Sequence, residues 1–318
     1  LPALPVLRSA LWALWALLRP AGEGAGLAQV TQRVLGRPLG RLVLLLCLGW
    51  GLLLLAANAR LFSLRFLSTS YSNSPAGLFL AVLLALALWL AWKPVRVLAR
   101  AGEIFRLALA VGLAFSLALG AFQIEPRHVL PIWAEDVPGL LSAAMPVLGL
   151  LGYGLFAAFL GGNVTRTEND RRRLLVWGTV FCLVLTALQL VCQGNFGPTL
   201  TARADTPFFL MVKGIGIEGT FQRVESLIIA LWVFSDLALL ALLASSCAAL
   251  AQAVFSLKER RHAAVPVAGL ALAGAWLLFP DAFSLDRWME NVVWPGNLLL
   301  GFGLPVLLLL VKKLRGQV

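Results

Sequence analysis

The chain has 318 residues, of which 60% are hydrophobic and only 13% are charged. A water-soluble domain carries about a quarter charged residues, and no soluble fold buries so many long apolar runs. The composition therefore excludes a water-soluble core and predicts an all-α polytopic membrane protein.

Nine apolar segments, separated by short charged loops, are predicted to cross the membrane as a single transmembrane domain over residues 1–318. In chain order they are 1–18, 41–63, 77–92, 104–123, 141–162, 174–192, 223–255, 263–279 and 293–311. Arg8 interrupts the first segment. The third is short, and Trp89 and Trp92 are placed to hold it at an interface.

The net charge of +11 is explained by topology rather than by nucleic-acid binding. Eighteen of the 26 basic residues lie in alternate loops: Arg19, Arg33, Arg37, Arg41, Lys93, Arg96, Arg100, Arg106, Arg166, Arg171, Arg172, Arg173, Lys258, Arg260, Arg261, Lys312, Lys313 and Arg315. By the positive-inside rule, the loop 163–173 and the C-terminus are cytoplasmic, and the loops 124–140 and 280–291 are outside. Nine spans then place residue 1 outside, so we expect one further span upstream.

Four motifs, in a common order, resemble those of the spore germination permeases. They are Leu35-Gly36-Arg37-Pro38-Leu39-Gly40-Arg41, the pair Thr199-Leu200-Thr201-Ala202-Arg203 and Thr206-Pro207-Phe208-Phe209, Arg223-Val224-Glu225-Ser226-Leu227 with Trp232, and Leu278-Phe279-Pro280-Asp281. These permeases are the GerAB-like B subunits of germinant receptors, in the amino acid–polyamine–organocation transporter superfamily. The resemblance implies a LeuT-like five-plus-five inverted-repeat bundle, with nine spans visible and the first helix missing.

On that helix count, the span 141–162 is helix six, which is unwound around the ligand in such transporters. It contains Gly149, Gly152, Tyr153 and Gly154, and glycine permits the open backbone that a break requires. We therefore expect an interruption at 152–154 that faces a cavity, with Tyr153 bonding to the ligand or closing over it. The alternative is that these glycines only allow helices to pack closely.

Asp236 lies deep in the span 223–255, where a carboxylate is costly and usually meets a cavity or a polar partner. We expect Asp236, with Ser235 beside it, to bind a substrate amine or to move a proton; a structural hydrogen bond is the alternative. Arg223 and Glu225 begin the same span, and their expected role is structural or gating, with Glu225 favoured by the helix dipole.

Three further features are two arginines and a short apolar run, both expected near the outer surface, and the side chains that could bind a metal. Arg60 and Arg65, close to the outer end of the second span, are expected to snorkel to the interface. The run 208–212 is expected to form an amphipathic helix on the outer face. The four cysteines form no CxxC pair and the two histidines lie in separate loops, so we predict neither metal nor cofactor and no enzyme activity.

The resemblance implies a permease-like subunit of a spore germinant receptor that binds a small germinant such as an amino acid. It would lie in the inner spore membrane or the bacterial cytoplasmic membrane, beside an A-type and a C-type receptor subunit. One alternative is a proton- or sodium-coupled amino acid transporter. Another is a structural membrane scaffold without a ligand site.

Overall fold

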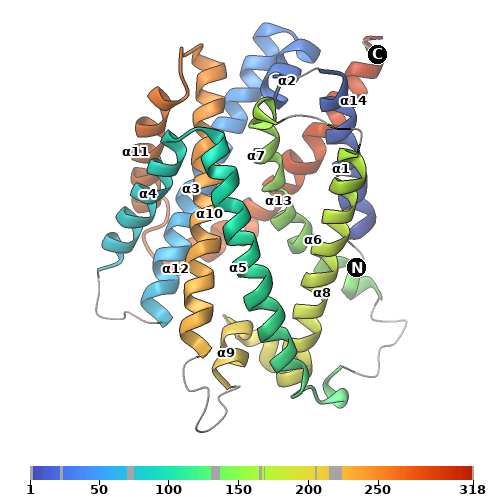
Figure 1. The fold of residues 1–318 in the computed structure, drawn as a ribbon, viewed down its shortest axis with the longest axis vertical. Coiled ribbons are helices and arrows are strands. Elements are labelled where there is room, and N and C mark those ends of the chain that lie inside the picture. Colours follow the sequence, from blue (N-terminus) through green and yellow to red (C-terminus); the bar gives the residue numbers. More distant parts are fainter. Residues whose placement is uncertain are drawn as a thin grey trace.

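The computed structural model describes residues 3–21, 24–69, 75–129, 137–164, 167, 169–204, 206–214 and 224–316, and their regular elements are helices (Figure 1). They are α1 (Leu4–Leu18), α2 (Leu27–Leu35), α3 (Arg37–Thr69), α4 (Ala76–Trp92), α5 (Val95–Ala121), α6 (Val137–Leu151), α7 (Gly154–Phe159), α8 (Asp170–Arg203), α9 (Pro207–Gly214), α10 (Val224–Phe255), α11 (Arg261–Leu277), α12 (Ala282–Trp288), α13 (Trp294–Leu298) and α14 (Leu304–Leu314). The helices α12, α13 and α14 form one rod through the π-helical turns Met289–Val293 and Leu299–Gly303.

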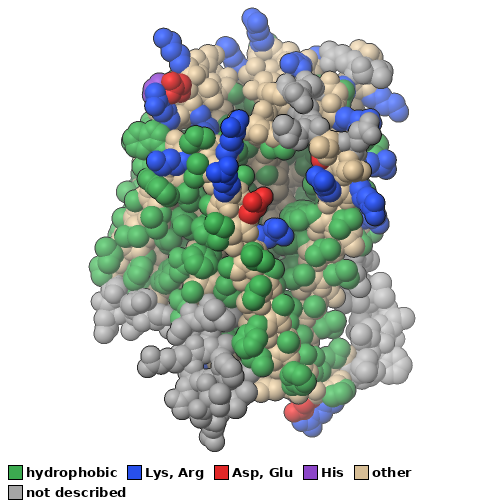
Figure 2. Space-filling view, viewed as in Figure 1, with side chains coloured by type: hydrophobic (Ala, Val, Ile, Leu, Met, Phe, Trp, Pro, Cys, Tyr) green, Lys and Arg blue, Asp and Glu red, His purple; other side chains and the backbone are tan. Residues whose placement is uncertain are grey.

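Five helices in the described residues are long and apolar enough to cross a bilayer: Arg37–Ser68, Val95–Ala121, Asp170–Arg203, Ile229–Phe255 and Ala282–Leu314. Three shorter apolar helices accompany them, namely Leu4–Leu18, Ala76–Trp92 and Ala144–Phe159. Lysine and arginine side chains gather at the end of the molecule that holds α2 and the C-terminus, above a broad apolar belt (Figure 2). The chain is therefore an integral membrane protein, whereas the count of nine spans stays a prediction.

The core is built where α10 packs against α3, α4 and α11. Leu54 of α3, Leu240 and Leu243 of α10 and Ala271 of α11 are fully buried there. Small residues bring the helices together: a Cβ at Gly51 would lie 2.6 Å from the Cys247 sulfur. Close packing of this kind drives helix association in lipid, where burial of apolar surface gives little.

The motif around Gly36 forms a tight corner between α2 and α3. Gly36 has a φ of 86°, a left-handed conformation that glycine adopts without strain. Pro38 then stands in the first turn of α3, where a missing N–H costs nothing. A Cβ at Gly40 would lie 2.8 Å from the Gln32 Cα. Backbone conformation at Gly36 and close packing at Gly40 therefore explain why the motif has glycine at both positions.

The stretch 194–222, between two of the predicted spans, is largely helical where it is described. The helix α8 continues to Arg203 through a kink at Gly197, whose φ is 75° and which Pro198 follows. The predicted short helix is present as α9, but its apolar side chains Phe209, Met211 and Val212 are buried against α5, α8 and α10. Its apolar face therefore packs on protein.

Candidate functional site

The span 141–162 is interrupted at residues 152 and 153, between the end of α6 and the start of α7. The N–H groups of Tyr153, Leu155 and Phe156 bond to carbonyls only three residues back, at 3.4, 3.1 and 3.1 Å. An uninterrupted α-helix would use carbonyls four residues back. The helix is therefore interrupted where predicted, as a tight turn in which these N–H groups keep carbonyl partners, and an unwound backbone that binds ligand stays a prediction.

Two of the glycines expected to bind ligand bring α6 against α13. A Cβ at Gly149 would lie 3.1 Å from the Trp294 Cα, and one at Gly152 only 2.5 Å from the Asn297 carbonyl oxygen. From the other side, a Cβ at Gly301 would lie 2.6 Å from the Gly152 Cα. Side chains at these positions would separate the two elements. We assign Gly149 and Gly152 to this close contact, as the packing alternative expected.

Gly154 differs from them, because a Cβ there would meet no atom within 4 Å. It faces a cavity of about 520 Å³ between α1, α7, α8 and the π-helical turn Leu299–Gly303. The lining is mostly aliphatic and small, and includes Leu11, Leu14, Leu151, Leu155, Ala157, Ala158, Gly161 and Phe302. Arg19 and Asp170 belong to its polar part. The volume suits a small ligand with an apolar body.

The other side of the break carries a buried polar cluster that the sequence analysis missed. Asn58 of α3 donates through Nδ2 to the Tyr153 hydroxyl at 2.9 Å, and Trp50 donates through Nε1 to the Asn297 Oδ1 at 2.9 Å. The Asn297 Nδ2 is buried and meets no hydrogen-bond partner in the described part of the chain. The available signal was the presence of asparagines deep in apolar spans.

A hydrogen bond from Ser246 connects α10 to the first turn after the break. Its hydroxyl donates to the Phe156 carbonyl at 2.8 Å, in the first turn after the break. Ser246 is fully buried, so this bond holds α7 against the core helix α10. Interhelical bonds of this kind are worth about 0.6 kcal/mol on average in membranes.

Asp236 pairs with an arginine of α3 rather than with the break. Its Oδ1 lies 3.5 Å from the Arg65 Nη1, and the Arg65 guanidinium stacks over Trp232 and Phe62, at 5.1 and 5.4 Å from the ring centroids. The Asp236 Oδ2 is buried without a hydrogen-bond partner among the described residues. The Arg65 side chain, 26% exposed, is therefore held by a buried carboxylate and two rings and does not simply extend to the interface as expected.

Helix geometry separates this ion pair from the break. Arg65 lies seven residues beyond Asn58 on α3, and Asp236 ten residues before Ser246 on α10. At 1.5 Å per residue, the pair lies roughly 10–15 Å from the break. The structure thus does not bring Asp236 and its half-buried neighbour Ser235 together with Tyr153 and Gly154.

Two residues expected at the site remain. Glu225 is the second residue of α10, and Arg223 lies outside the described residues. For metal binding, the described residues contain no group of three or more His, Cys, Asp or Glu side chains that could hold an ion. The four cysteines are buried and free.

The other arginine expected to snorkel, Arg60, is buried. It donates to the carbonyls of Phe279 and Pro280, at 3.0 and 2.7 Å, and lies over the Trp276 ring. These carbonyls follow the C-terminal end of α11, where the helix dipole favours a cation. The snorkelling expectation is therefore wrong for Arg60. The motif Leu278–Asp281 has a structural role, because two of its carbonyls accept hydrogen bonds from Arg60.

The fold and the site thus define a helical membrane protein in which one apolar helix is interrupted beside a cavity. The chain matches the family of spore germination proteins, the spore permeases, over residues 10–278 and belongs to that family. It is also 25% identical over 199 residues to a Bacillus subtilis (strain 168) protein named "Putative spore germination protein YfkT". That alignment covers 61% of this chain and 53% of the relative, so the chain matches about half of the relative's length. The family is one of permeases and receptors, not of enzymes.

Proposed function

We propose that this chain is the permease-like, germinant-sensing subunit of a spore germinant receptor and that it binds a small germinant beside Gly154. The observation that carries the proposal is the helix break next to the apolar cavity. Only Gly154 among the three glycines lines that cavity, and it presents bare backbone to it. An amino acid with an aliphatic side chain fits this lining best, with its polar groups on the broken helix backbone.

Germinant binding would be relayed through the buried polar cluster. The break is tied to α3 by Tyr153 and Asn58, and to α10 by Ser246. A ligand that changes the backbone at 152–154 would strain these bonds and shift α3 against α10. A ligand shifts such an equilibrium only by its difference in affinity for the two states. The A-type and C-type subunits would receive this change, in the inner spore membrane and with the C-terminus in the cytoplasm.

The alternative, a proton- or sodium-coupled amino acid transporter, is favoured by one observation. Asp236 is a buried carboxylate with one oxygen unpaired among the described residues, and such carboxylates mark proton routes in transporters. The two functions differ in a measurable way. A sensor gives no net uptake of labelled amino acids into vesicles, whereas a coupled transporter accumulates them along an ion gradient.

The test is the variant Gly154→Leu in the full-length protein, compared with Gly49→Leu on α3. Neither position has an atom within 4 Å of an added Cβ, but only Gly154 lines the cavity. Spores carrying each variant would be exposed singly to each of the twenty amino acids, with germination followed by loss of optical density. We expect Gly154→Leu to abolish or shift the response at normal abundance and Gly49→Leu to leave it unchanged. Normal dose–response curves for Gly154→Leu would refute this ligand site.

A further inference from the structure

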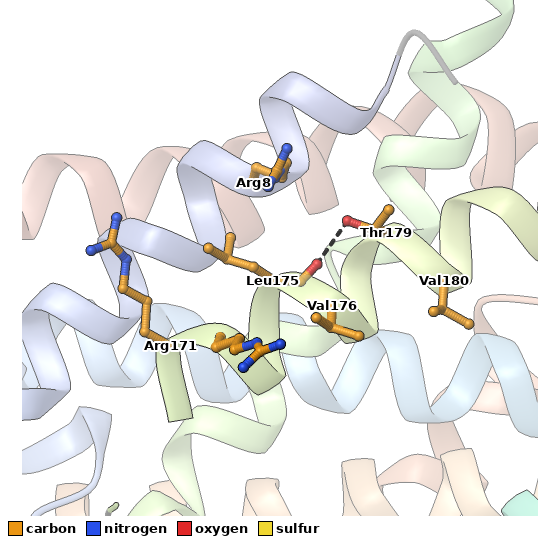
Figure 3. Close-up of a pocket in the computed structure, with 7 residues that line it drawn as sticks. Arg8, Arg171, Leu175, Val176, Thr179 and Val180 are labelled. Atoms are coloured by element: carbon orange, nitrogen blue, oxygen red, sulfur yellow. Dashed lines mark hydrogen bonds between the residues drawn. The ribbon is translucent and has the colours of Figure 1, made fainter. Parts of the chain in front are cut away.

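A second groove, of about 470 Å³, lies between α1 and α8 on a different face of α8 from the apolar cavity. Figure 3 shows Arg8 reaching it from α1 and Arg171 from α8. Arg172 completes a set of three arginines. The rest of the lining is Leu175, Val176, Thr179 and Val180.

The charged side chains of the groove are all positive. Its three arginines are exposed, and none of its lining residues is acidic. The neighbouring acid, Asp170, lines the apolar cavity instead and accepts hydrogen bonds from Thr167. Among the described residues, neither Arg8 nor Arg172 forms an ion pair, so the groove suits an anion.

The arginines occupy two depths along the helix pair. Arg171 stacks over Trp15 at 5.5 Å, in the first turn of α8, and tryptophan is typical of the membrane interface. Arg8 precedes Trp15 by seven residues of α1 and so lies about 10 Å deeper. An exposed arginine at that depth faces hydrocarbon, which is costly unless the side chain extends towards the interface and an anion.

Below the arginines, the wall of the groove is apolar. Leu175, Val176 and Val180 present aliphatic side chains, and the Thr179 hydroxyl donates to the Leu175 carbonyl of its own helix at 2.8 Å (Figure 3). The Thr179 hydroxyl is therefore already used within its own helix. A cationic upper part and an apolar lower part match the two parts of a phospholipid.

We propose that this groove binds one anionic phospholipid, whose phosphate contacts Arg8, Arg171 and Arg172 while one acyl chain lies along Val176 and Val180. The apolar wall distinguishes a lipid from a free phosphate ion, which would use the arginines alone. Basic pockets between membrane helices on the cytoplasmic side are suited to such headgroups. The proposal does not depend on germinant sensing.

The experiment uses the full-length protein in mild detergent, titrated with phosphatidylglycerol, phosphatidylcholine or inorganic phosphate, with bound lipid counted by native mass spectrometry. The variant Arg8→Gln/Arg171→Gln/Arg172→Gln is compared with Arg37→Gln/Arg100→Gln/Arg106→Gln, which removes the same charge from exposed positions elsewhere. A membrane-surface arginine strengthens anionic lipid binding about fivefold, so the groove variant should bind phosphatidylglycerol about a hundredfold more weakly. The control should bind it as the unmodified protein does.

A second variant, Val176→Trp, keeps all three arginines and fills the apolar wall at an exposed position. It should also lose phosphatidylglycerol, and it keeps the test decisive where the triple variant fails to fold. Equal binding of phosphatidylglycerol and phosphatidylcholine, or equal loss in both triple variants, would overturn the site. Phosphatidylglycerol binding unchanged in Val176→Trp, with inorganic phosphate competing for it, would assign the groove to a free anion instead.

Discussion

The Asn58 side chain donates a hydrogen bond to the Tyr153 hydroxyl at 2.9 Å, and this bond fastens the break between α6 and α7 to the middle of α3. Asn58 also donates to the Leu54 carbonyl one turn back, at 2.7 Å, which fixes the side chain that meets Tyr153. The Tyr153 hydroxyl accepts in this pair and keeps its own proton to donate. The bond therefore positions the break and leaves one donor for a polar partner.

The variant Tyr153→Phe should separate that positioning role from bulk stability. It removes one interhelical hydrogen bond and keeps the ring, so the loss of stability should be only about 0.5–1 kcal/mol. The germination response should still shift to higher germinant concentration, because the break is no longer tied to α3. Thermal unfolding in detergent and a dose–response curve measure the two effects. An unchanged curve would mean that the bond is purely structural.

The two glycines at the break should differ in their tolerance of an added methyl group. Gly152→Ala places a Cβ 2.5 Å from the Asn297 carbonyl oxygen, so α6 and α13 must move apart at a cost of about 1–3 kcal/mol. Gly154→Ala adds a methyl group in open space and should change stability by less than about 0.5 kcal/mol. Melting temperatures of the two purified variants give the comparison. Equal melting temperatures would contradict the packing role of Gly152.

The sequence predicted the break, but it did not predict that Gly152 would pack against a neighbouring helix while Gly154 would line the cavity. Glycine spacing signals an open backbone, yet it does not tell which Cβ position meets a neighbour, as at Gly152, and which meets a cavity, as at Gly154. Asp236 stood out as a costly charge. Its partner Arg65 did not, because pairing across helices 171 residues apart in sequence is set by the tertiary fold. The same holds for Arg60, which the apolar pattern placed at the interface.

The Asp236–Arg65 pair should be strongly coupled. Asp236 is 4% exposed, so Arg65→Leu leaves a buried carboxylate without its cation and should cost about 3–5 kcal/mol. Arg65→Leu/Asp236→Leu removes both charges and should cost less than Arg65→Leu alone. Denaturation in detergent of these two variants and of the single variant Asp236→Leu completes the cycle. A double variant as unstable as the sum of the single ones would show that the two residues do not interact.

Asp236→Asn tests the electrostatic role of the same carboxylate in function, because it keeps the shape and removes the charge. The pair lies roughly 10–15 Å from the break. We therefore expect the variant to abolish or shift the germinant response by altering the contact between α3 and α10, while the protein stays in the membrane. Spore dose–response curves, with abundance checked by immunoblot, measure this. A normal response at normal abundance would limit Asp236 to a structural role.

Arg60 should be needed for the connection between α11 and α12. Arg60→Gln gives up hydrogen bonds from a charged group to the Phe279 and Pro280 carbonyls, which are worth about 1.5–3 kcal/mol each. The exposed Arg287, changed to Gln, serves as the matched control and should be neutral. Limited proteolysis at the 278–281 connection should be faster in Arg60→Gln. Equal cleavage of variant, control and unmodified protein would rule out this anchoring role.

Cysteine labelling from outside intact cells should establish the topology. His128→Cys and Asp286→Cys lie in segments expected outside, the second on α12 where a loop was expected, and Asn169→Cys lies in the basic loop expected in the cytoplasm. The four native cysteines are buried, so a membrane-impermeant maleimide should give little background. We expect label at 128 and 286 in intact cells, and at 169 only after the membrane is permeabilised. Label at 169 in intact cells would reverse the map and place the groove of Arg8 and Arg171 on the outer side. An anionic phospholipid would then have to be supplied by the outer leaflet, so this measurement also fixes which leaflet the groove samples.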